Sequence, residues 1–264
     1  MSATMNGAIN TAIDSANPLR LQGLTAIVTG ASRGIGEGCA RMLASLGAHV
    51  ILVARNAADL EKLCAEIRNA GGTADFWAMD LNNAEEFRRR VDALPAIHIL
   101  VNNAGMNKPQ PFVEVDEAAF DQIFNLNVKV NYFCAQTVAR RMIATQSEGS
   151  IIMMSSQSGH VALRDRTVYC ATKFAMEGMS KAMALELAKH QIRVNTVAPT
   201  FVLTPMTKPF LDDPEFARYV QDNIPLGRMA TVEEVAAAVA YLAAPVSRMV
   251  TGTSMLVDGG WTMK

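Results

Sequence analysis

The chain has 264 residues, half of them hydrophobic and 19% charged, with a formal net charge of −1. This near-neutral balance argues against nucleic acid or an anionic membrane as a partner, because both select basic surfaces. The sequence has no apolar run of about 18 residues, so it predicts no membrane-spanning helix.

The first eighteen residues have neither a basic start nor a continuous apolar stretch, so they predict no secretory signal. We expect residues 1–20 to form a flexible N-terminal arm and residues 21–264 to form one domain, since no linker or repeat divides them. The cysteines lack metal-ligand spacing, so no metal site is predicted. They indicate reduced, mostly buried thiols of a cytoplasmic protein. These are Cys39, Cys64, Cys134 and Cys170.

From residue 24 onward, short apolar runs alternate with longer helical patterns. The apolar runs predict strands at 24–30, 49–54, 74–80, 97–105, 149–156, 192–199 and 253–260. The helical patterns lie at 35–47, 56–71, 83–94, 116–145, around Tyr169 and at 231–244, whereas prolines make 204–229 irregular. This alternation predicts an α/β protein with one doubly wound (Rossmann) domain, in which helices cover both faces of a parallel seven-stranded sheet. Ligands of such folds bind beyond the carboxyl ends of the strands.

A glycine-rich turn, "TGASRGIG" at Thr29–Gly36, follows the first strand and opens the first helix. Gly30, Gly34 and Gly36 let the backbone turn sharply and approach an anion, which a helix N-terminus attracts. A glycine turn alone is weak evidence. Its position between the first strand and the first helix makes it a predicted dinucleotide-binding loop.

The end of the second strand indicates which dinucleotide is bound. A carboxylate there would bind the ribose hydroxyls of NAD, but the sequence has Ala54 and Arg55, with Arg33 in the glycine turn. Two guanidinium groups would neutralise a 2′-phosphate, so we predict NADP(H). The alternative is that both arginines are ordinary solvated residues.

Two further strand ends carry candidate cofactor contacts. Asp80 ends the third strand, where it could meet the adenine amino group or cap the following helix. The fourth strand ends in "NNAG" at Asn102–Gly105, whose small residues would let the backbone pass close to a cofactor. A plain strand-to-loop turn is the competing interpretation.

The segment "VYCATK" places Tyr169 four residues before Lys173 in a predicted helix. Residues four apart share a helix face, and a nearby ammonium group favours the phenolate of a tyrosine. The alternative is an ordinary surface pair. The fifth strand ends in Ser155 and Ser156, and Asn127 lies in the long helical region.

Together these residues resemble the short-chain dehydrogenase/reductase family from about Leu21 to Met263. The matching motifs are T-G-x-x-x-G-x-G, N-N-A-G, a strand-terminal serine and Y-x-x-x-K, in this order. The resemblance implies that Tyr169 donates a proton to the substrate carbonyl oxygen and that Ser156, thirteen residues earlier, hydrogen-bonds it. It implies that Lys173 binds the nicotinamide ribose and that Asn127 holds a water, although Asn127 could equally be a structural kink residue.

The resemblance also implies a set of cofactor contacts along the chain. These are Gly30, Ser32, Arg33, Gly34, Ile35, Gly36, Arg55, Asp80, Leu81, Asn103, Ala104, Gly105, Tyr169, Lys173, Pro199, Thr200, Val202 and Thr204. The sequence departs mildly from the family where Thr200 follows Pro199, since many relatives have glycine there.

Within the family, several stretches look similar to dicarbonyl/L-xylulose reductases, which suggests small ketoses and α-dicarbonyls as substrates. This likeness would put Ser156, Gln157, Leu163 and Arg166 beside the substrate, with Leu211 in an apolar lid. Those reductases carry a histidine where this chain has Arg166. Arginines are mostly exposed, which favours a surface position. Inside the pocket, an arginine would accept a carboxylate or phosphate.

The sequence therefore predicts an NADP(H)-dependent oxidoreductase that interconverts a small ketone and its secondary alcohol. One alternative is a 3-oxoacyl-carrier-protein reductase, and another is a regulator that binds NADP without turnover. The resemblance implies a homotetramer, with the helices around Asn127 and Tyr169 at one interface and the C-terminus at another.

Overall fold

The computed structural model of the protein describes residues 16–263. Most of the expected N-terminal arm, residues 1–15, therefore lies outside the described residues. Leu21 is already fully buried, and its amide donates a hydrogen bond to the carbonyl oxygen of Leu46.

Seven parallel strands form the centre of the protein, as predicted. They are β1 (Thr25–Thr29), β2 (His49–Ala54), β3 (Thr73–Ala78), β4 (Ile99–Asn102), β5 (Gly149–Met154), β6 (Ile192–Pro199) and β7 (Ser254–Val257). Their order in the sheet is β3-β2-β1-β4-β5-β6-β7. The chain reverses its direction of travel across the sheet between β1 and β4, and the crevice of a doubly wound fold opens at such a reversal.

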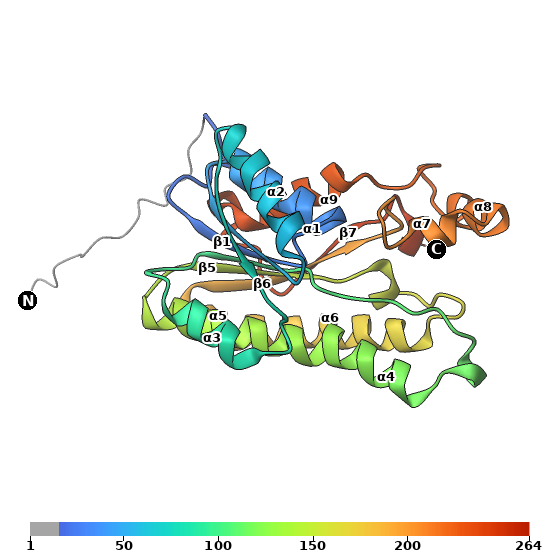
Figure 1. The fold of residues 1–264 in the computed structure, drawn as a ribbon. Helices are drawn as coiled ribbons and strands as arrows, with labels where there is room; N and C mark the ends of the chain where they lie inside the picture. The colour runs from blue at the N-terminus through green and yellow to red at the C-terminus, as the bar shows by residue number, and fades with distance from the viewer. Residues whose placement is uncertain (1–15, 264) are drawn as a thin grey trace, which may run out of the picture.

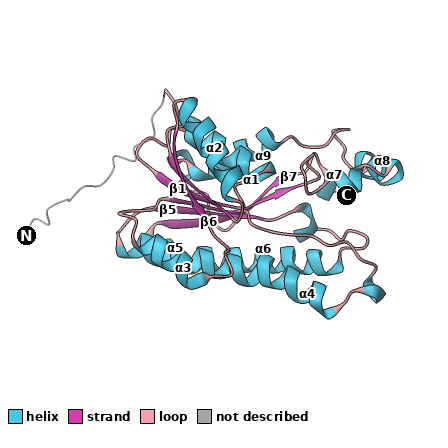
Figure 2. Cartoon of the chain, in the orientation of Figure 1, coloured by secondary structure: helices cyan, strands magenta, loops and turns pink. Residues whose placement is uncertain are grey.

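Helices cover both faces of the sheet (Figures 1 and 2). One face carries α1 (Gly34–Ser45), α2 (Ala57–Asn69) and α9 (Val232–Ala243). The other face carries α3 (Ala84–Asp92), α4 (Glu117–Phe124), α5 (Asn131–Ala144) and α6 (Thr167–Leu187). The two-sided cover explains why the strands read as continuous apolar runs rather than as alternating ones.

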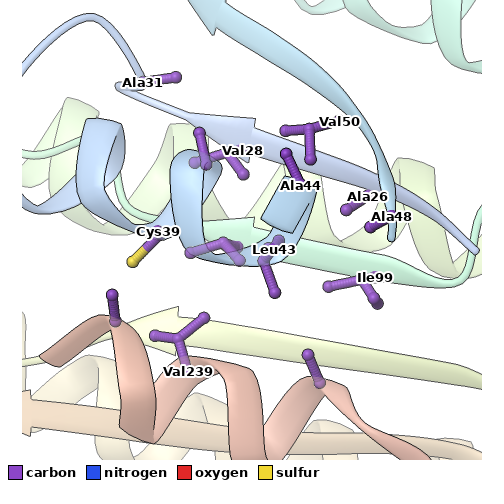
Figure 3. Close-up of a cluster of buried hydrophobic side chains, with 14 of the residues drawn as sticks. Ala26, Val28, Ala31, Cys39, Leu43, Ala44, Ala48, Val50, Ile99 and Val239 are labelled. Atoms are coloured by element: carbon purple, nitrogen blue, oxygen red, sulfur yellow. The ribbon is translucent and has the colours of Figure 1, made fainter. Parts of the chain in front are cut away.

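Each face of the sheet has its own hydrophobic core. Along β5, Ile152 and Met154 pack toward α1 and α9, whereas Ile151 and Met153 pack toward α5 and α6. Figure 3 shows the first core, where β1, β2 and α1 meet Val239 of α9. All four cysteines are free thiols, and burial raises the pKa of two of them to about 12. These two are Cys39 and Cys134.

The long helical region predicted over 116–145 is not one regular helix. A wider π-helical segment, η2 (Asn125–Val130), separates α4 from α5. The buried side chain of Asn127 lies in this segment. π-Helical turns inside α-helices are rare and are frequent at functional sites.

The stretch predicted to be irregular at 204–229 contains two short helices, α7 (Lys208–Leu211) and α8 (Pro214–Asp222). Pro209 and Pro214 lie in the first turns of these helices, where a missing N–H group costs no hydrogen bond. Both helices lie beyond the carboxyl edge of the sheet, beside β7 (Figure 1). None of the helices in residues 16–263 is long and apolar enough to cross a membrane.

Candidate active site

The glycine turn after β1 has a backbone that glycine alone adopts easily. Gly30 and Gly34 have φ angles of +62° and +61°. A Cβ atom on Gly36 would overlap the carbonyl oxygen of Gly30. No side chain caps the N-terminus of α1 at Arg33, so its first amide groups are available to an anion.

The loop after β4 is fastened to this turn through Thr29. The Thr29 hydroxyl accepts hydrogen bonds from the backbone amides of Asn103 (2.9 Å) and Ala104 (3.0 Å). The Asn103 side chain donates in turn to the carbonyl oxygens of Thr29 (3.0 Å) and Gly30 (3.2 Å). The structure thus joins the two predicted cofactor loops at the reversal point of the sheet.

The predicted phosphate corner carries two unpaired cations. Arg33 and Arg55 are both exposed, and neither forms an ion pair with a carboxylate of residues 16–263. Asp80 is exposed and accepts a hydrogen bond from the amide of Asn82. The side chain that caps α3 is that of Asn83, so the alternative interpretation of Asp80 as a helix cap is wrong. The remaining predicted residues here, Ser32, Ile35 and Leu81, are at least partly buried.

The segment after β6 runs back along the glycine turn. Pro199 is the last residue of β6, and the buried hydroxyl of Thr200 has no protein partner. Val202 is buried in the core. Thr204 lies against the turn, because a Cβ atom on Gly34 would be 3.4 Å from the Cβ atom of Thr204.

Tyr169 and Lys173 lie on the first two turns of α6, facing the end of β5. The Lys173 Nζ atom is 5.4 Å from the centre of the Tyr169 ring and donates a 2.7 Å hydrogen bond to the carbonyl oxygen of Met154. The Ser156 and Tyr169 side chains line the same pocket, and interaction with Ser156 lowers the pKa of Tyr169. The Ser156 side-chain oxygen accepts a 3.1 Å hydrogen bond from the amide of Ser158. Ser156, Tyr169 and Lys173 are apart in the sequence but thus lie close together in the structure.

The pKa values of this cluster correct one expectation. Burial raises the pKa of Tyr169 to about 12, and the interaction with Ser156 opposes this rise only in part. Burial also lowers the pKa of Lys173 to about 8, which nearby Glu177 counteracts. The expected lowering of the phenol pKa by Lys173 is therefore not found: burial dominates, and the groups that oppose it are Ser156 and Arg166.

Asn127 ties three segments together. Its Oδ1 atom accepts a 2.9 Å hydrogen bond from the amide of Met106, and its Nδ2 atom donates to the Met106 carbonyl oxygen (2.9 Å) and the Thr172 hydroxyl (3.2 Å). A Cβ atom on Gly105 would lie 3.4 Å from Asn127 Oδ1. Asn127 therefore holds the loop after β4 against α6, directly beside Lys173.

An open pocket is lined by both Ser156 and Tyr169. Its lining residues are Asn107, Ser156, Gln157, Ser158, Leu163, Arg166, Tyr169, Thr200, Phe201, Met206, Thr207 and Phe210. Ser155 is buried and does not line the pocket. Several lining atoms are buried without a hydrogen-bond partner in the described part of the chain: Asn107 Oδ1, both amide atoms of Gln157, Ser158 Oγ and Thr200 Oγ1. Buried polar atoms need hydrogen bonds, so the pocket suits a ligand rich in polar groups.

Arg166 is a pocket residue, so the expectation of an ordinary surface arginine is wrong. Only 7% of the residue is exposed. The expectation failed because Phe210 of α7 and Phe216 of α8 cover the guanidinium group, and the sequence had indicated no helices there.

The structure does not place Leu211 beside the predicted substrate. Leu211 packs against a small cluster that contains Phe201 and Trp261, while Phe210 lines the pocket. Because α7 is helical, consecutive residues point in different directions. Sequence reasoning also missed Asn107 and Ser158, which belong to no recognised motif.

The fold and this cluster define a nucleotide-dependent oxidoreductase. A glycine turn and a Ser-Tyr-Lys cluster lie together at the carboxyl edge of a doubly wound sheet, where such proteins bind nucleotides.

Comparisons with known proteins give the family. Residues 30–262 match the family model described as enoyl-(acyl carrier protein) reductase. The chain is 42% identical to an L-xylulose reductase of Mesocricetus auratus, over 92% of this chain and 98% of that protein. It is 36% identical to a D-threitol dehydrogenase of Mycolicibacterium smegmatis, over 93% and 95% of the two chains.

A solved gluconate 5-dehydrogenase of Burkholderia cenocepacia, in complex with NADP and tartrate, has a TM-score of 0.89 to this structure. It is 33% identical and covers 93% of this chain and 98% of its own. The chain belongs to the short-chain dehydrogenase/reductase family.

Proposed function

We propose that the protein is an NADP(H)-dependent oxidoreductase that interconverts a small polar ketone and its secondary alcohol. The observation that carries this proposal is the pocket that brings the Ser156 and Tyr169 hydroxyls together above Lys173.

The residues beyond the sheet fit the cofactor. The uncapped N-terminus of α1 suits a pyrophosphate, and Arg33 and Arg55 suit a 2′-phosphate, since no described carboxylate pairs with either of them. The loop clamped by Thr29, together with Thr200 and Thr204, would hold the nicotinamide end. When bound, NADPH supplies the hydride.

Three side chains would take part in proton transfer to the substrate. The raised pKa keeps the Tyr169 phenol protonated at neutral pH, so it acts as the acid when a ketone is reduced. Ser156 accepts a hydrogen bond from an amide and so keeps its own proton free to donate to the carbonyl oxygen, which stabilises developing negative charge. The Lys173 ammonium group supports the charge left on the phenolate, and Asn127 fixes the loop beside it.

Relatives support the substrate class. The curated relatives named for L-xylulose and D-threitol act on small polyhydroxy compounds, and the unpartnered polar atoms of Gln157, Asn107 and Ser158 suit hydroxyl groups. We extend this class to the present protein.

The test is oxidation of NADPH, with NADH in parallel, across a panel of L-xylulose, erythrulose, diacetyl and a carrier-bound 3-oxoacyl thioester. We expect turnover of the small ketones with NADPH. Tyr169→Phe should lower kcat at least 100-fold because it removes the transferable proton. Tyr132→Phe, an exposed tyrosine of α5, is the matched control.

Equal rates in wild type and Tyr169→Phe would discredit this mechanism. Turnover of the carrier-bound thioester alone would favour the 3-oxoacyl-carrier-protein reductase, and NADP binding without any turnover would favour the regulator.

We further propose that the protein is a cytoplasmic homotetramer. The free, buried cysteines support a reducing compartment. Exposed apolar side chains on α4, α5 and α6 support the assembly, among them Phe120, Phe133 and Phe174.

A further inference from the structure

Arg166 is a charged group built into the wall of the candidate active site. It lies just before α6, and its guanidinium carbon is 5.4 Å from the ring centre of Phe210 and 4.9 Å from that of Phe216. The two aromatic faces fix the plane of the guanidinium group. The same pocket wall contains Ser156 and Tyr169.

The protein leaves most of the hydrogen-bonding capacity of Arg166 unused. A guanidinium group has five N–H donors, and the one side-chain hydrogen bond among residues 16–263 runs from Nη1 to the carbonyl oxygen of Arg164 (2.9 Å). No carboxylate of the described chain forms an ion pair with it. Asp165, its neighbour in sequence, is exposed and attracts it only at longer range. A buried cation without a counter-ion is costly, and burial lowers the pKa of Arg166.

Neutral polar groups share the rest of the pocket wall with apolar side chains. The amide group of Gln157, the Asn107 Oδ1 atom and the Ser158 hydroxyl are buried without a hydrogen-bond partner among residues 16–263. One ligand that satisfied all of these groups would carry several hydroxyl groups and one anionic end. A carboxylate offers two oxygen atoms to the guanidinium fork and can bind it bidentately.

We propose that the substrate pair is a short polyhydroxy carboxylic acid and its keto form, with the carboxylate bound by Arg166. This inference rests on the proposed function and narrows its substrate class. In the oxidative direction, the Tyr169 phenol first releases its proton to solvent. The secondary alcohol carbon then gives a hydride to NADP⁺ while its hydroxyl gives a proton to the Tyr169 phenolate, so the products are the ketone, NADPH and one released proton. The carboxylate is unchanged and serves to position the carbon.

The competing explanation is that Arg166 only anchors α7 and α8 by stacking. That role would weaken turnover of every substrate by a similar factor, because Phe210 of α7 lines the same pocket as Ser156 and Tyr169. A role in recognition changes the ratio between charged and neutral substrates instead. The test must therefore compare matched pairs.

The experiment measures kcat/KM with NADP⁺ for D-threitol against D-threonate and for xylitol against D-xylonate. Each pair differs only in a hydroxymethyl group or a carboxylate at one end. Reduction of diacetyl with NADPH measures turnover independently of charge. The variants are Arg166→Gln and Arg166→Lys, and Arg164→Gln removes the same charge from an exposed side chain two residues away.

In the wild type, we expect the aldonates to exceed the matched polyols by at least tenfold in kcat/KM. Arg166→Gln should lower kcat/KM for the aldonates roughly 10- to 100-fold, because a charge-assisted hydrogen bond is lost. The polyols and diacetyl should change less than about threefold. Arg166→Lys should fall between the two, and Arg164→Gln should match the wild type.

If the wild type turns over polyols as well as or better than aldonates, the inference is overturned and the proposed function stands. An equal loss for all substrates in folded Arg166→Gln would assign Arg166 to lid packing and also overturn it. If that variant does not fold, the wild-type preference and the Arg166→Lys ratio decide. No turnover of diacetyl, polyols or aldonates would instead overturn the proposed function itself.

Discussion

Two opposing influences set the pKa of Lys173 and therefore its charge at neutral pH. Burial lowers its pKa to about 8, while Glu177, one turn further along α6, raises it. Glu177 is held in place by hydrogen bonds from the hydroxyls of Thr196 (2.9 Å) and Ser254 (3.2 Å) and lies 3.4 Å from His160 Nε2. A carboxylate that no motif includes therefore tunes the lysine.

This arrangement predicts the pH dependence of reduction. The ammonium form of Lys173 is present below about pH 8 and is lost above it, so kcat/KM for a ketone should fall about tenfold per pH unit above that value. Glu177→Gln removes the attraction that raises the pKa, so the fall should begin at a lower pH. The measurement is the pH profile of kcat/KM. Glu186→Gln, an exposed carboxylate on the same helix, should leave the profile unmoved. A break that stays in place or moves upward in Glu177→Gln would contradict this role.

At the residue level, the sequence predicted which side chains form the candidate active site better than it predicted their burial and their charged neighbours. Tyr169, Lys173 and Ser156 were identified because their spacing is tied to one helix and one strand end. The burial of Arg166 depends on α7 and α8 folding across it, and the charge on Lys173 depends on Glu177, which is held by residues of β6 and β7. Such long-range neighbours leave no local pattern.

At the level of elements, the two cofactor loops depend on one hydroxyl. Thr29 accepts hydrogen bonds from two backbone amides of the loop after β4. If a methyl group replaced the hydroxyl, the Ala104 amide would lose its one acceptor among residues 16–263, and the Asn103 amide would keep only its 3.1 Å bond to the Val101 carbonyl oxygen.

Thr29→Val should therefore lower the free energy of unfolding by roughly 1–3 kcal/mol and raise KM for NADPH. Thr25→Val is the matched control, since Thr25 begins the same strand and its hydroxyl has no hydrogen bond to another described residue. Chemical denaturation and cofactor titration give the two values. A loss of stability that is equal in both variants would show that the clamp contributes nothing beyond strand propensity.

The strands and most helices were predictable because their signals are local. Seven apolar runs and the helices between them follow from hydrophobic periodicity. The π-helical turn at Asn125–Val130 was not predictable, since its sequence continues an ordinary helical pattern. Within this turn the Asn127 side chain binds the backbone of Met106, a contact across 21 positions of the chain.

At the level of the whole molecule, the two layers differ in what they expose. The layer of α4, α5 and α6 presents large apolar side chains to solvent, including Phe133 and Phe174, which are 43% and 50% exposed. Such side chains are unfavourable on a lone monomer when they gather on one layer, and they indicate an interface. The parallel seven-stranded sheet and its cover of helices on both faces were predictable from the alternation of elements. The order of the strands and the exposure of these phenyl rings were not.

Light scattering should therefore give a mass near four copies of the 28.5 kDa chain. Phe133→Arg should shift this mass toward dimers or monomers, because it would put a charge into the proposed interface. Ala65→Arg adds the same charge to the exposed surface of α2 and should leave the mass unchanged. A monomeric wild type would rule out the tetramer.

The bond from Lys173 to the last carbonyl oxygen of β5 has one more consequence. This hydrogen bond fixes the position of the Lys173 ammonium group relative to the end of β5. Because β5 is buried along its whole length, the catalytic side chains are held by a rigid part of the protein. We expect the hydrogen bond between Lys173 and Met154 to persist on heating or in denaturant until the sheet unfolds. We therefore expect sequence differences among relatives to be concentrated in α7 and α8. Substitutions in these helices can change substrate preference without affecting the residues that transfer the proton.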